Sequence, residues 1–277
     1  MQTTHSFLDN RSGDWRGCLD KSLRFLRESW ATQWVGLPFV VDACADFLDL
    51  NGNAQTDISA KLLAAAREVA FEIEADSASN SLYAEPLYHN RLHFADVLTT
   101  VTLQAAIESE HSKLIDTQWQ TALILIAIAH DYQHPGRINR YGAEIEQLSV
   151  DALRPLLHTH AVPDKWIERI ERVILASDFS LVSKNHDRIA GKAFSWNIDW
   201  VTVLINEADV MASVLEEFGS ELGVALANEW ALASVPMHSS VATEQGRLEF
   251  LASTLFSSYS ATLLGVPNDR LTQLGNH

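Results

Sequence analysis

One segment, AIAHDYQHPGRIN at 127–139, limits what this chain can fold into more than any other. It continues an uninterrupted apolar run at 122–129 and then places His130, Asp131 and His134 directly before a Pro-Gly pair. A helix that is apolar on every side packs at the centre of a protein, and a Pro-Gly pair ends it. The sequence therefore predicts a central, buried helix that ends in ionisable side chains.

The rest of the chain has a helical pattern. Apolar residues recur every three or four positions, and no segment alternates apolar and polar residues as a half-buried strand does. Glycine and proline are sparse, with 12 and 7 copies in 277 residues. We expect an all-α fold, a compact multi-helix bundle, with an N-terminal helical subdomain at 1–80 packed on a core at 81–277. We expect one helix at 56–75, a second that begins near Tyr88, and a third at 242–265. A polar loop is expected at 76–81.

Charge and cysteine content limit the partners of the protein. Acidic residues outnumber basic ones by 36 to 20, so the net charge is −16, which repels polyanions such as nucleic acids. The longest apolar run is too short to span a bilayer, and the first residues lack the order of a signal peptide. Cys18 and Cys44 have no paired spacing, which favours a reducing compartment. We expect a cytoplasmic protein with a small-molecule partner and no nucleic-acid or membrane partner; a homo-oligomer stays open.

Two His-x3-His elements point to a metal. His89 and His93 form the first, and His130 and His134 form the second; on a helix, residues four apart share one face. A buried histidine beside an aspartate is costly unless the two are paired, hydrogen-bonded or bound to metal. The repeated element and the step from His130 to Asp131 favour a metal over a simple buried hydrogen bond. Histidine and carboxylate ligands without cysteine suit zinc, manganese, iron or magnesium.

A further carboxylate is expected downstream. Asp209 lies on or beside an apolar helical stripe at 201–208, where it requires a cation or a set of N–H donors. Asp178 is the rival candidate. It comes where a helix is expected to end, so that capping is its alternative role.

The order of these residues resembles a known family. The HD(x2)H(x4)N spacing at 130–139 is similar to the signature of class I cyclic-nucleotide phosphodiesterases, a branch of the HD-domain metal-dependent phosphohydrolases. YHNRLHFADV at 88–97 resembles their Tyr-His-Asn-x-x-His-Ala-x-Asp-Val element, and VILASDFS and LINEADVMAS resemble later segments in the same order. The resemblance covers roughly 83–260. It implies a phosphodiesterase that hydrolyses a cyclic nucleotide or a related small phosphodiester with a hydroxide bridging two divalent metal ions.

The resemblance also implies roles for individual residues. The first metal would be held by His93, His130, Asp131 and Asp209, and Asp131 would bridge to a second metal. His89 would be the general acid, because an alkoxide leaves poorly without a proton. Residues expected around this centre, orienting waters, ligands and loops, are Tyr88, Asn90, His134, Asn139, Glu144, Glu146 and Asp178.

The expected base-binding segment departs from the family. The family reads the base with a glutamine and a phenylalanine three residues later, but here Phe250 is matched with Arg247, and Gln245 with Leu248. We regard Gln245, Arg247 and Phe250 as candidate substrate-binding residues, with a core role for Phe250 as the alternative.

Two alternative functions stay open. A phosphomonoesterase or nucleotidase on the same site would need basic groups near the metals, for which Arg91, Arg137 and Arg140 are candidates. A non-catalytic metal- or ligand-binding sensor with the same fold would show a broken ligand set, and none of the expected ligands is missing.

Overall fold

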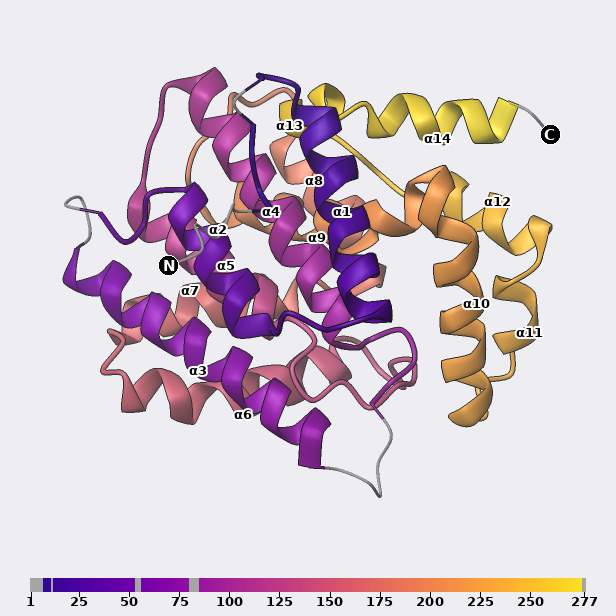
Figure 1. Ribbon diagram of the computed structural model, residues 1–277, viewed down its shortest axis with the longest axis horizontal. Coiled ribbons are helices and arrows are strands. Elements are labelled where there is room, and N and C mark those ends of the chain that lie inside the picture. Colours follow the sequence, from indigo (N-terminus) through magenta and orange to yellow (C-terminus); the bar gives the residue numbers. More distant parts are fainter. Residues whose placement is uncertain (1–6, 11, 53–55, 80–84, 276–277) are drawn as a thin grey trace.

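The structure, a computed structural model, describes residues 7–10, 12–52, 56–79 and 85–275. All regular elements among these residues are helices, which confirms the all-α prediction (Figure 1). The elements in chain order are α1 (Trp15–Ala31), α2 (Leu37–Phe47), α3 (Asp57–Ser79), α4 (Arg91–Ser112), α5 (Thr117–Ala129), α6 (Glu144–Thr159), α7 (Asp164–Leu175), η1 (Phe179–Leu181), α8 (Val182–Ile189), α9 (Ile198–Val214), α10 (Glu216–Leu232), α11 (His238–Val241), α12 (Glu244–Ser253), α13 (Tyr259–Leu263) and α14 (Val266–Gly275).

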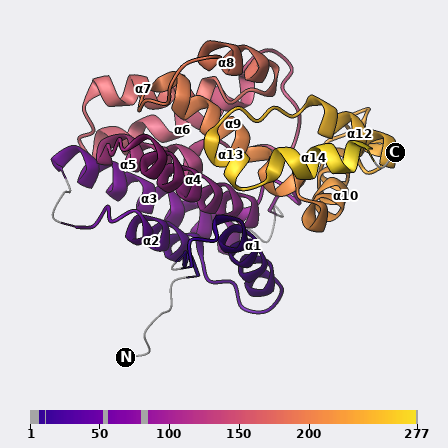
Figure 2. The same ribbon diagram turned by 90° about the horizontal axis from the view of Figure 1, so that it is seen from above.

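Helices α4 and α5 occupy the centre of the bundle. Figure 2 shows α1, α2 and α3 on one side of this pair and α6, α7, α8 and α9 on the other. Every residue of α5 from Trp119 to Ala129 is buried, as expected for a helix with apolar residues on all sides. Among the described residues, no helix combines the length and the apolar character needed to cross a membrane.

The N-terminal helices share the buried core of the rest of the chain. Leu23 of α1, Val40 of α2 and Leu63 of α3 belong to one cluster of buried residues that extends to Val266. The expected subdomain boundary at 80/81 lies outside the described residues. Helices α10, α11 and α12 stand beside the bundle, and α10 contacts it through α9 (Figure 1).

Three predicted elements differ from the structure. Helix α4 begins at Arg91 instead of near Tyr88, because the Asn90 side chain caps it by accepting hydrogen bonds from the backbone N–H of Leu92 and His93 at 2.9 and 3.1 Å. The loop expected at 76–81 is helical as far as residue 79, and 80–81 lie outside the described residues. Helix propensity is a weak guide for such small polar residues.

The third difference concerns the helix expected at 242–265. It is divided into α12 and α13 by an extended segment at 254–258. The buried carboxylate of Glu207 binds this segment by accepting hydrogen bonds from the backbone N–H of Ser257 and Ser258 at 2.6 and 2.9 Å. The sequence pattern also gave no sign of α8, α10 and α14, which are helical in the structure.

Because Glu207 is buried, we expect the free energy of unfolding to depend on pH. Its side chain is fully buried, and burial raises the pKa of Glu207 to about 7, against about 4.3 in an unfolded chain. A raised folded pKa means that the protonated group stabilises the fold below the unfolded pKa, and that this contribution is lost as pH rises through about 7. The free energy of unfolding should therefore fall by up to roughly 1.4 kcal/mol per pH unit between about pH 5 and 7.

Glu207→Gln is the matched variant, because an amide mimics the protonated carboxyl. The Gln104 amide donates to Glu207 at 3.0 Å, and its oxygen has no hydrogen-bond partner within the described part of the chain. It can therefore rotate to accept from the new amide. Urea unfolding at pH 5 and 7.5 should show the decrease in wild type and a smaller one in the variant. The same decrease in both proteins would contradict the assignment to Glu207.

Candidate active site

Three helices bring four metal-ligand side chains to one point. His93 lies in the first turn of α4, His130 and Asp131 follow the end of α5, and Asp209 lies in α9. Their ligand atoms all lie within 4.8 Å of one another. Nε2 of His93 is 3.1 Å from Oδ1 of Asp209 and 3.4 Å from Oδ2 of Asp131. Nε2 of His130 is 3.3 Å from Oδ2 of Asp131. We call these four residues the HHDD cluster.

Both imidazoles direct an unsatisfied nitrogen into the HHDD cluster. Nε2 of His93 and Nε2 of His130 are buried and have no hydrogen-bond partner among the described residues. Nδ1 of His130 lies 2.9 Å from the carbonyl oxygen of Ala127. Because a carbonyl only accepts, Nδ1 carries a proton, and Nε2 is the nitrogen that faces the carboxylates and is placed to bind a metal. Buried polar atoms without a partner are rare in proteins, so these two nitrogens fit the role of metal ligands.

The charges in the cluster favour a cation. Burial by itself would lower the pKa of His93, but Asp131 and Asp209 outweigh this effect and raise it to about 9. The two carboxylates therefore stabilise a positive charge at the point where the imidazoles converge. Ligand atoms about 2.1 Å from a common ion lie about 3.0–3.4 Å apart in octahedral or tetrahedral coordination, close to the observed separations. The donor set fits a divalent cation such as zinc or manganese.

His89 lies beside the HHDD cluster and outside helix α4, because the helix begins only at Arg91. Its Nε2 is 4.0 Å from Oδ2 of Asp131. Its ring stacks on the ring of His134 with a centroid distance of 3.6 Å. His89 and His93 therefore do not share a helical face as the sequence predicted, although their rings are only 5.6 Å apart.

Glu229 of α10 holds His89 in place. Its Oε1 is 2.5 Å from Nδ1 of His89, and its Oε2 accepts hydrogen bonds from the backbone N–H of Tyr88 and His89 at 2.7 and 3.0 Å. Burial would raise the pKa of Glu229, but His89 and these amides lower it well below its usual value. The ionised carboxylate therefore accepts from Nδ1–H and leaves Nε2 of His89 directed at the cluster.

The turn that follows His134 packs against the same carboxylate. Gly136 has a φ of +67°, and its backbone N–H donates to Nδ1 of His134 at 3.0 Å. A Cβ atom at Gly136 would lie 3.3 Å from Cγ of Glu229. Glycine is thus required at this turn both by the backbone conformation and by the close approach of α10.

The sequence did not single out Glu229. Glu229 is far from His89 in the sequence, and no local motif contains it. Its burial, at 3% exposure, is visible only in the structure, so no sequence signal was available to find it. Ser213, whose hydroxyl lies 2.9 Å from the Tyr88 hydroxyl, was also missed.

Asn139 and Glu146 lie in the segment that leads into α6. The Asn139 amide donates to Glu146 at 2.9 Å and accepts from the backbone N–H of Ile145 at 2.7 Å. Burial raises the pKa of Glu146, and the carboxylates of Asp178 and Asp131 add to this effect. Glu146 therefore lies within the electrostatic influence of the site without belonging to the HHDD cluster.

Glu144 and Asp178 have structural partners. Glu144 is buried and bound by Arg137, with N···O distances of 2.9 and 2.7 Å, and by Arg140. Asp178 accepts hydrogen bonds from the backbone N–H of Ala143 at 2.6 Å and of Ser180 at 2.8 Å. Asp178 thus caps η1, the alternative role that the sequence left open, and is not part of the HHDD cluster.

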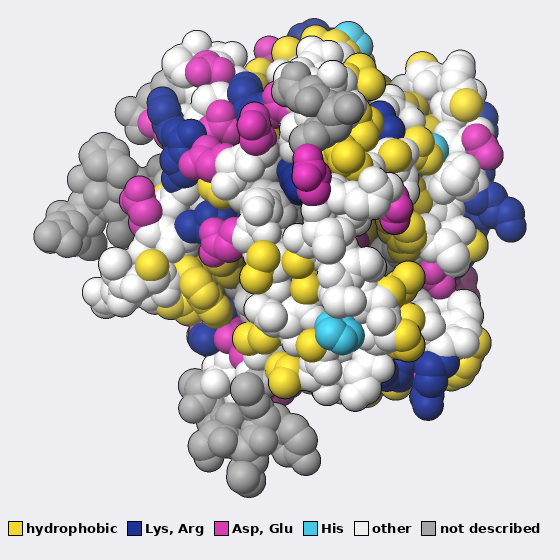
Figure 3. Space-filling view, turned by 90° about the vertical axis from the view of Figure 1, so that its right-hand side faces the viewer, with side chains coloured by type: hydrophobic (Ala, Val, Ile, Leu, Met, Phe, Trp, Pro, Cys, Tyr) yellow, Lys and Arg dark blue, Asp and Glu magenta, His cyan; other side chains and the backbone are white. Residues whose placement is uncertain are grey.

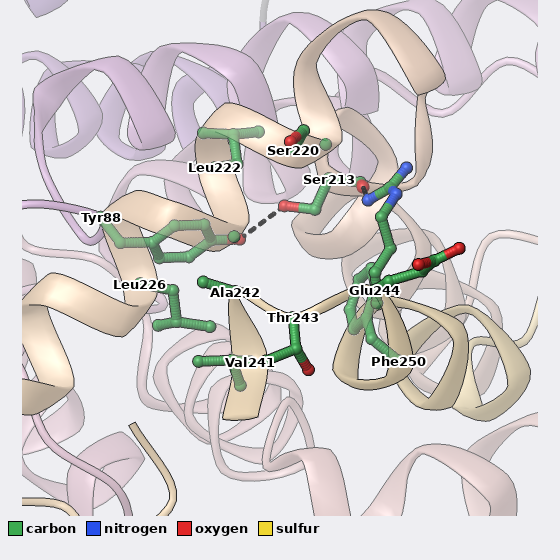
Figure 4. A pocket seen from close by; sticks show the side chains of 13 residues that line it. Tyr88, Ser213, Ser220, Leu222, Leu226, Val241, Ala242, Thr243, Glu244 and Phe250 are labelled. Atoms are coloured by element: carbon green, nitrogen blue, oxygen red, sulfur yellow. Dashed lines mark hydrogen bonds between the residues drawn. The ribbon is translucent and has the colours of Figure 1, made fainter. Parts of the chain in front are cut away.

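A pocket of about 330 Å³ is lined by Tyr88 and Ser213. It begins at Tyr88, whose ring centroid is 5.0 Å from that of His93. Figure 4 shows Tyr88 and Ser213 at one side, and Val241, Thr243 and Phe250 opposite them. On the face that Figure 3 displays, hydrophobic side chains are more prominent than charged ones near the centre.

The three candidate substrate-binding residues have different positions. Phe250 and Arg247 line the pocket. Gln245 lies outside its lining, and its exposed amide donates to Glu249 at 2.8 Å. The glutamine at 245 is therefore not placed to contact a ligand in this pocket.

Comparison with known proteins gives a family match and matches to solved structures. The family model for 3'5'-cyclic nucleotide phosphodiesterase matches residues 88–150, which include His89, His93, His130 and Asp131. A Leishmania protein, LmjPDEB1, solved in complex with IBMX, has the same fold with a TM-score of 0.62 at 14% identity, over 92% of this chain and 88% of that chain. No curated protein sequence matches this chain significantly.

Proposed function

Because this chain has the fold and the histidine motifs of class I cyclic-nucleotide phosphodiesterases, we propose that it is a metal-dependent phosphodiesterase. The observation that carries the proposal is the convergence of two unpartnered imidazole nitrogens and two carboxylates in the HHDD cluster. The substrate is a cyclic nucleotide or a related small phosphodiester.

The metal assignment extends the proposal. His93, His130, Asp131 and Asp209 would hold one divalent cation, and Asp131 would also serve a second. The ions are zinc, manganese, iron or magnesium. When bound, such ions acidify a water molecule near neutral pH and neutralise charge on the phosphate oxygens.

His89 has the role of general acid. Its Nε2 faces the HHDD cluster, and Glu229 holds its Nδ1–H. The ring delivers a proton to the leaving alkoxide oxygen as the P–O bond breaks. Stacking on His134 limits rotation of the ring, so the proton is held toward the position of the leaving group.

The arginines near the site favour a diester over a monoester. A monoester dianion needs free basic groups, but Arg91 is bound to Glu74 and Glu85 with N···O distances of 2.8 and 3.0 Å. Arg137 and Arg140 are both bound to Glu144. Arg91 is therefore neutralised, whereas Arg137 and Arg140 share one carboxylate and have their donors directed at it. This pairing disfavours the monoesterase alternative, which needs basic groups turned toward the substrate.

The proposal also covers location. The two cysteines, Cys18 and Cys44, are free and buried, which is consistent with a reducing, cytoplasmic environment.

The test is activity with and without metal. Protein stripped with a chelator should lose hydrolysis of 3',5'-cyclic nucleotides and regain it with one of the four divalent ions. Loaded protein should hydrolyse a cyclic diester much faster than p-nitrophenyl phosphate, a monoester. Equal or faster turnover of the monoester would contradict a phosphodiesterase, and unchanged activity after stripping would contradict a metal enzyme.

A further inference from the structure

The hydroxyl groups that face the pocket beside Tyr88 are already hydrogen-bonded inside the protein. The hydroxyls of Tyr88 and Ser213 bond to each other at 2.9 Å. Thr243 donates to the carbonyl oxygen of Ser240 at 2.6 Å. The bond between Tyr88 and Ser213 uses one of their two O–H donors, so one hydroxyl can still donate to a substrate and each oxygen can still accept. Because a hydroxyl can either donate or accept, these groups do not distinguish one base edge from another.

Arg247 brings a cation to the pocket wall, but its guanidinium is bound to the end of α9. Nη1 donates to the carbonyl oxygen of Ser213 at 3.0 Å, and Nη2 donates to that of Val214 at 3.4 Å and to the Gln273 side chain. Carbonyls in the last turn of a helix lack partners within the helix, and a positive charge there is favoured by the helix dipole. Arg247 thus ties α12 and α14 to the end of α9.

The guanidinium of Arg247 also packs closely against Gly219 of α10. A Cβ atom at Gly219 would lie 2.2 Å from Nη1 of Arg247 and 2.3 Å from the carbonyl oxygen of Ser213. Only a glycine leaves room for this close approach. Arg247 is therefore held from α9, α10 and α14 together, and it is a positioning residue for the pocket wall.

The remaining lining is apolar or lies at the solvent-exposed rim. Ser220 is exposed, and its hydroxyl can either donate or accept, so it does not distinguish between two base edges. Glu244 is also exposed at the rim, where water screens its charge. The apolar side chains of the lining are Leu222, Leu226, Val241, Ala242 and Phe250.

We infer that this pocket holds the base of a cyclic nucleotide by shape and apolar contact, an inference that rests on the proposed function. Adenine and guanine nucleotides are therefore hydrolysed with similar efficiency. A site that hydrogen-bonds a substrate edge rejects an analogue without that edge by about 10⁴–10⁵-fold. An apolar pocket separates similar substrates by only about 10²-fold or less. The selectivity of this protein between adenine and guanine nucleotides is therefore that of an apolar pocket.

The first experiment is a kinetic comparison with metal-loaded protein. The kcat/KM values for cyclic AMP and cyclic GMP should agree within about 100-fold. A larger preference for either nucleotide would overturn the inference. A diester without a base, methyl p-nitrophenyl phosphate, is measured in parallel. Its hydrolysis together with a large base preference would reject only the inference and keep the phosphodiesterase.

A second arm needs no catalysis. AMP and GMP should bind with dissociation constants that also agree within about 100-fold, measured by calorimetry. If no diester is hydrolysed, the proposed function fails while this measurement still tests the pocket. A larger affinity difference, or no binding of either nucleotide, would overturn the inference.

Arg247→Met tests the positioning role. The variant keeps an unbranched apolar side chain but removes the guanidinium and its donors, so the melting temperature should fall and KM should rise for both cyclic nucleotides together. The ratio of the two kcat/KM values should stay within about threefold of wild type, since a uniform loss of binding leaves discrimination unchanged. A tenfold or larger change in the ratio would show that Arg247 reads the base. Arg154→Met on α6, which removes an exposed ion pair with Glu171, is the matched control.

Discussion

Asp131→Asn is expected to lower kcat/KM for a cyclic nucleotide ~10³-fold while the protein stays folded. Oδ2 of Asp131 lies 3.4 Å from Nε2 of His93 and 3.3 Å from Nε2 of His130. Asparagine keeps the shape of the side chain but removes the negative charge that faces both imidazoles. Metal ions contribute several kcal/mol to transition-state stabilisation, and roughly 1.4 kcal/mol corresponds to tenfold in rate. Elemental analysis should show reduced metal content.

The control is Asp199→Asn. Asp199 lies in the first turn of α9, the helix that also carries Asp209, but it does not belong to the HHDD cluster. It should retain wild-type metal content and activity. Full activity in Asp131→Asn, or equal losses in both variants, would remove the support for the metal centre.

His89→Asn is expected to have the second-largest effect, and this effect should depend on the leaving group. Loss of a general acid costs about 10²–10⁴-fold when the leaving group is an alkoxide that needs a proton. A p-nitrophenolate leaves without one, so methyl p-nitrophenyl phosphate should lose much less activity. Metal content should be unchanged, because Nε2 of His89 stands 4.0 Å from Asp131, at the edge of the HHDD cluster.

Two further variants complete this test. Glu229→Gln keeps His89 but removes the charge beside its Nδ1. It should lower the hydrolysis of the cyclic nucleotide more than that of methyl p-nitrophenyl phosphate, as His89→Asn does, but by a smaller factor. His158→Asn, at the exposed end of α6, controls for the exchange of histidine for asparagine. Equal losses on both substrates in His89→Asn would argue that His89 supports the fold or the metal instead of donating a proton.

The central part of the site was predictable because its signals are local. The apolar run before His130 requires a buried helix, and the short spacings to Asp131 and His134 fix their places just beyond its end. Helical periodicity likewise identified α9 and the apolar stripe beside Asp209. In each case, the pattern is contained within a few turns of one helix, where sequence spacing determines geometry.

The unpredicted parts depend on contacts between distant segments. Glu229 meets His89 only because α10 lies beside the segment that precedes α4. Arg247 lies in a segment that was expected to bind substrate, yet its guanidinium ends on carbonyls of α9. Sequence spacing places the backbone of such a residue, but the end of a long side chain is decided by the surfaces that assemble around it.

The close packing of Gly136 against Glu229 shows that the proposed active site has two separable parts. The HHDD cluster is built on α4, α5 and α9, whereas the orientation of His89 is secured by α10. Bulk introduced at residue 136 would push on the carboxylate and spare the ligands. Such a protein would remain fully loaded with metal and yet turn over poorly, so metal occupancy alone is no measure of competence.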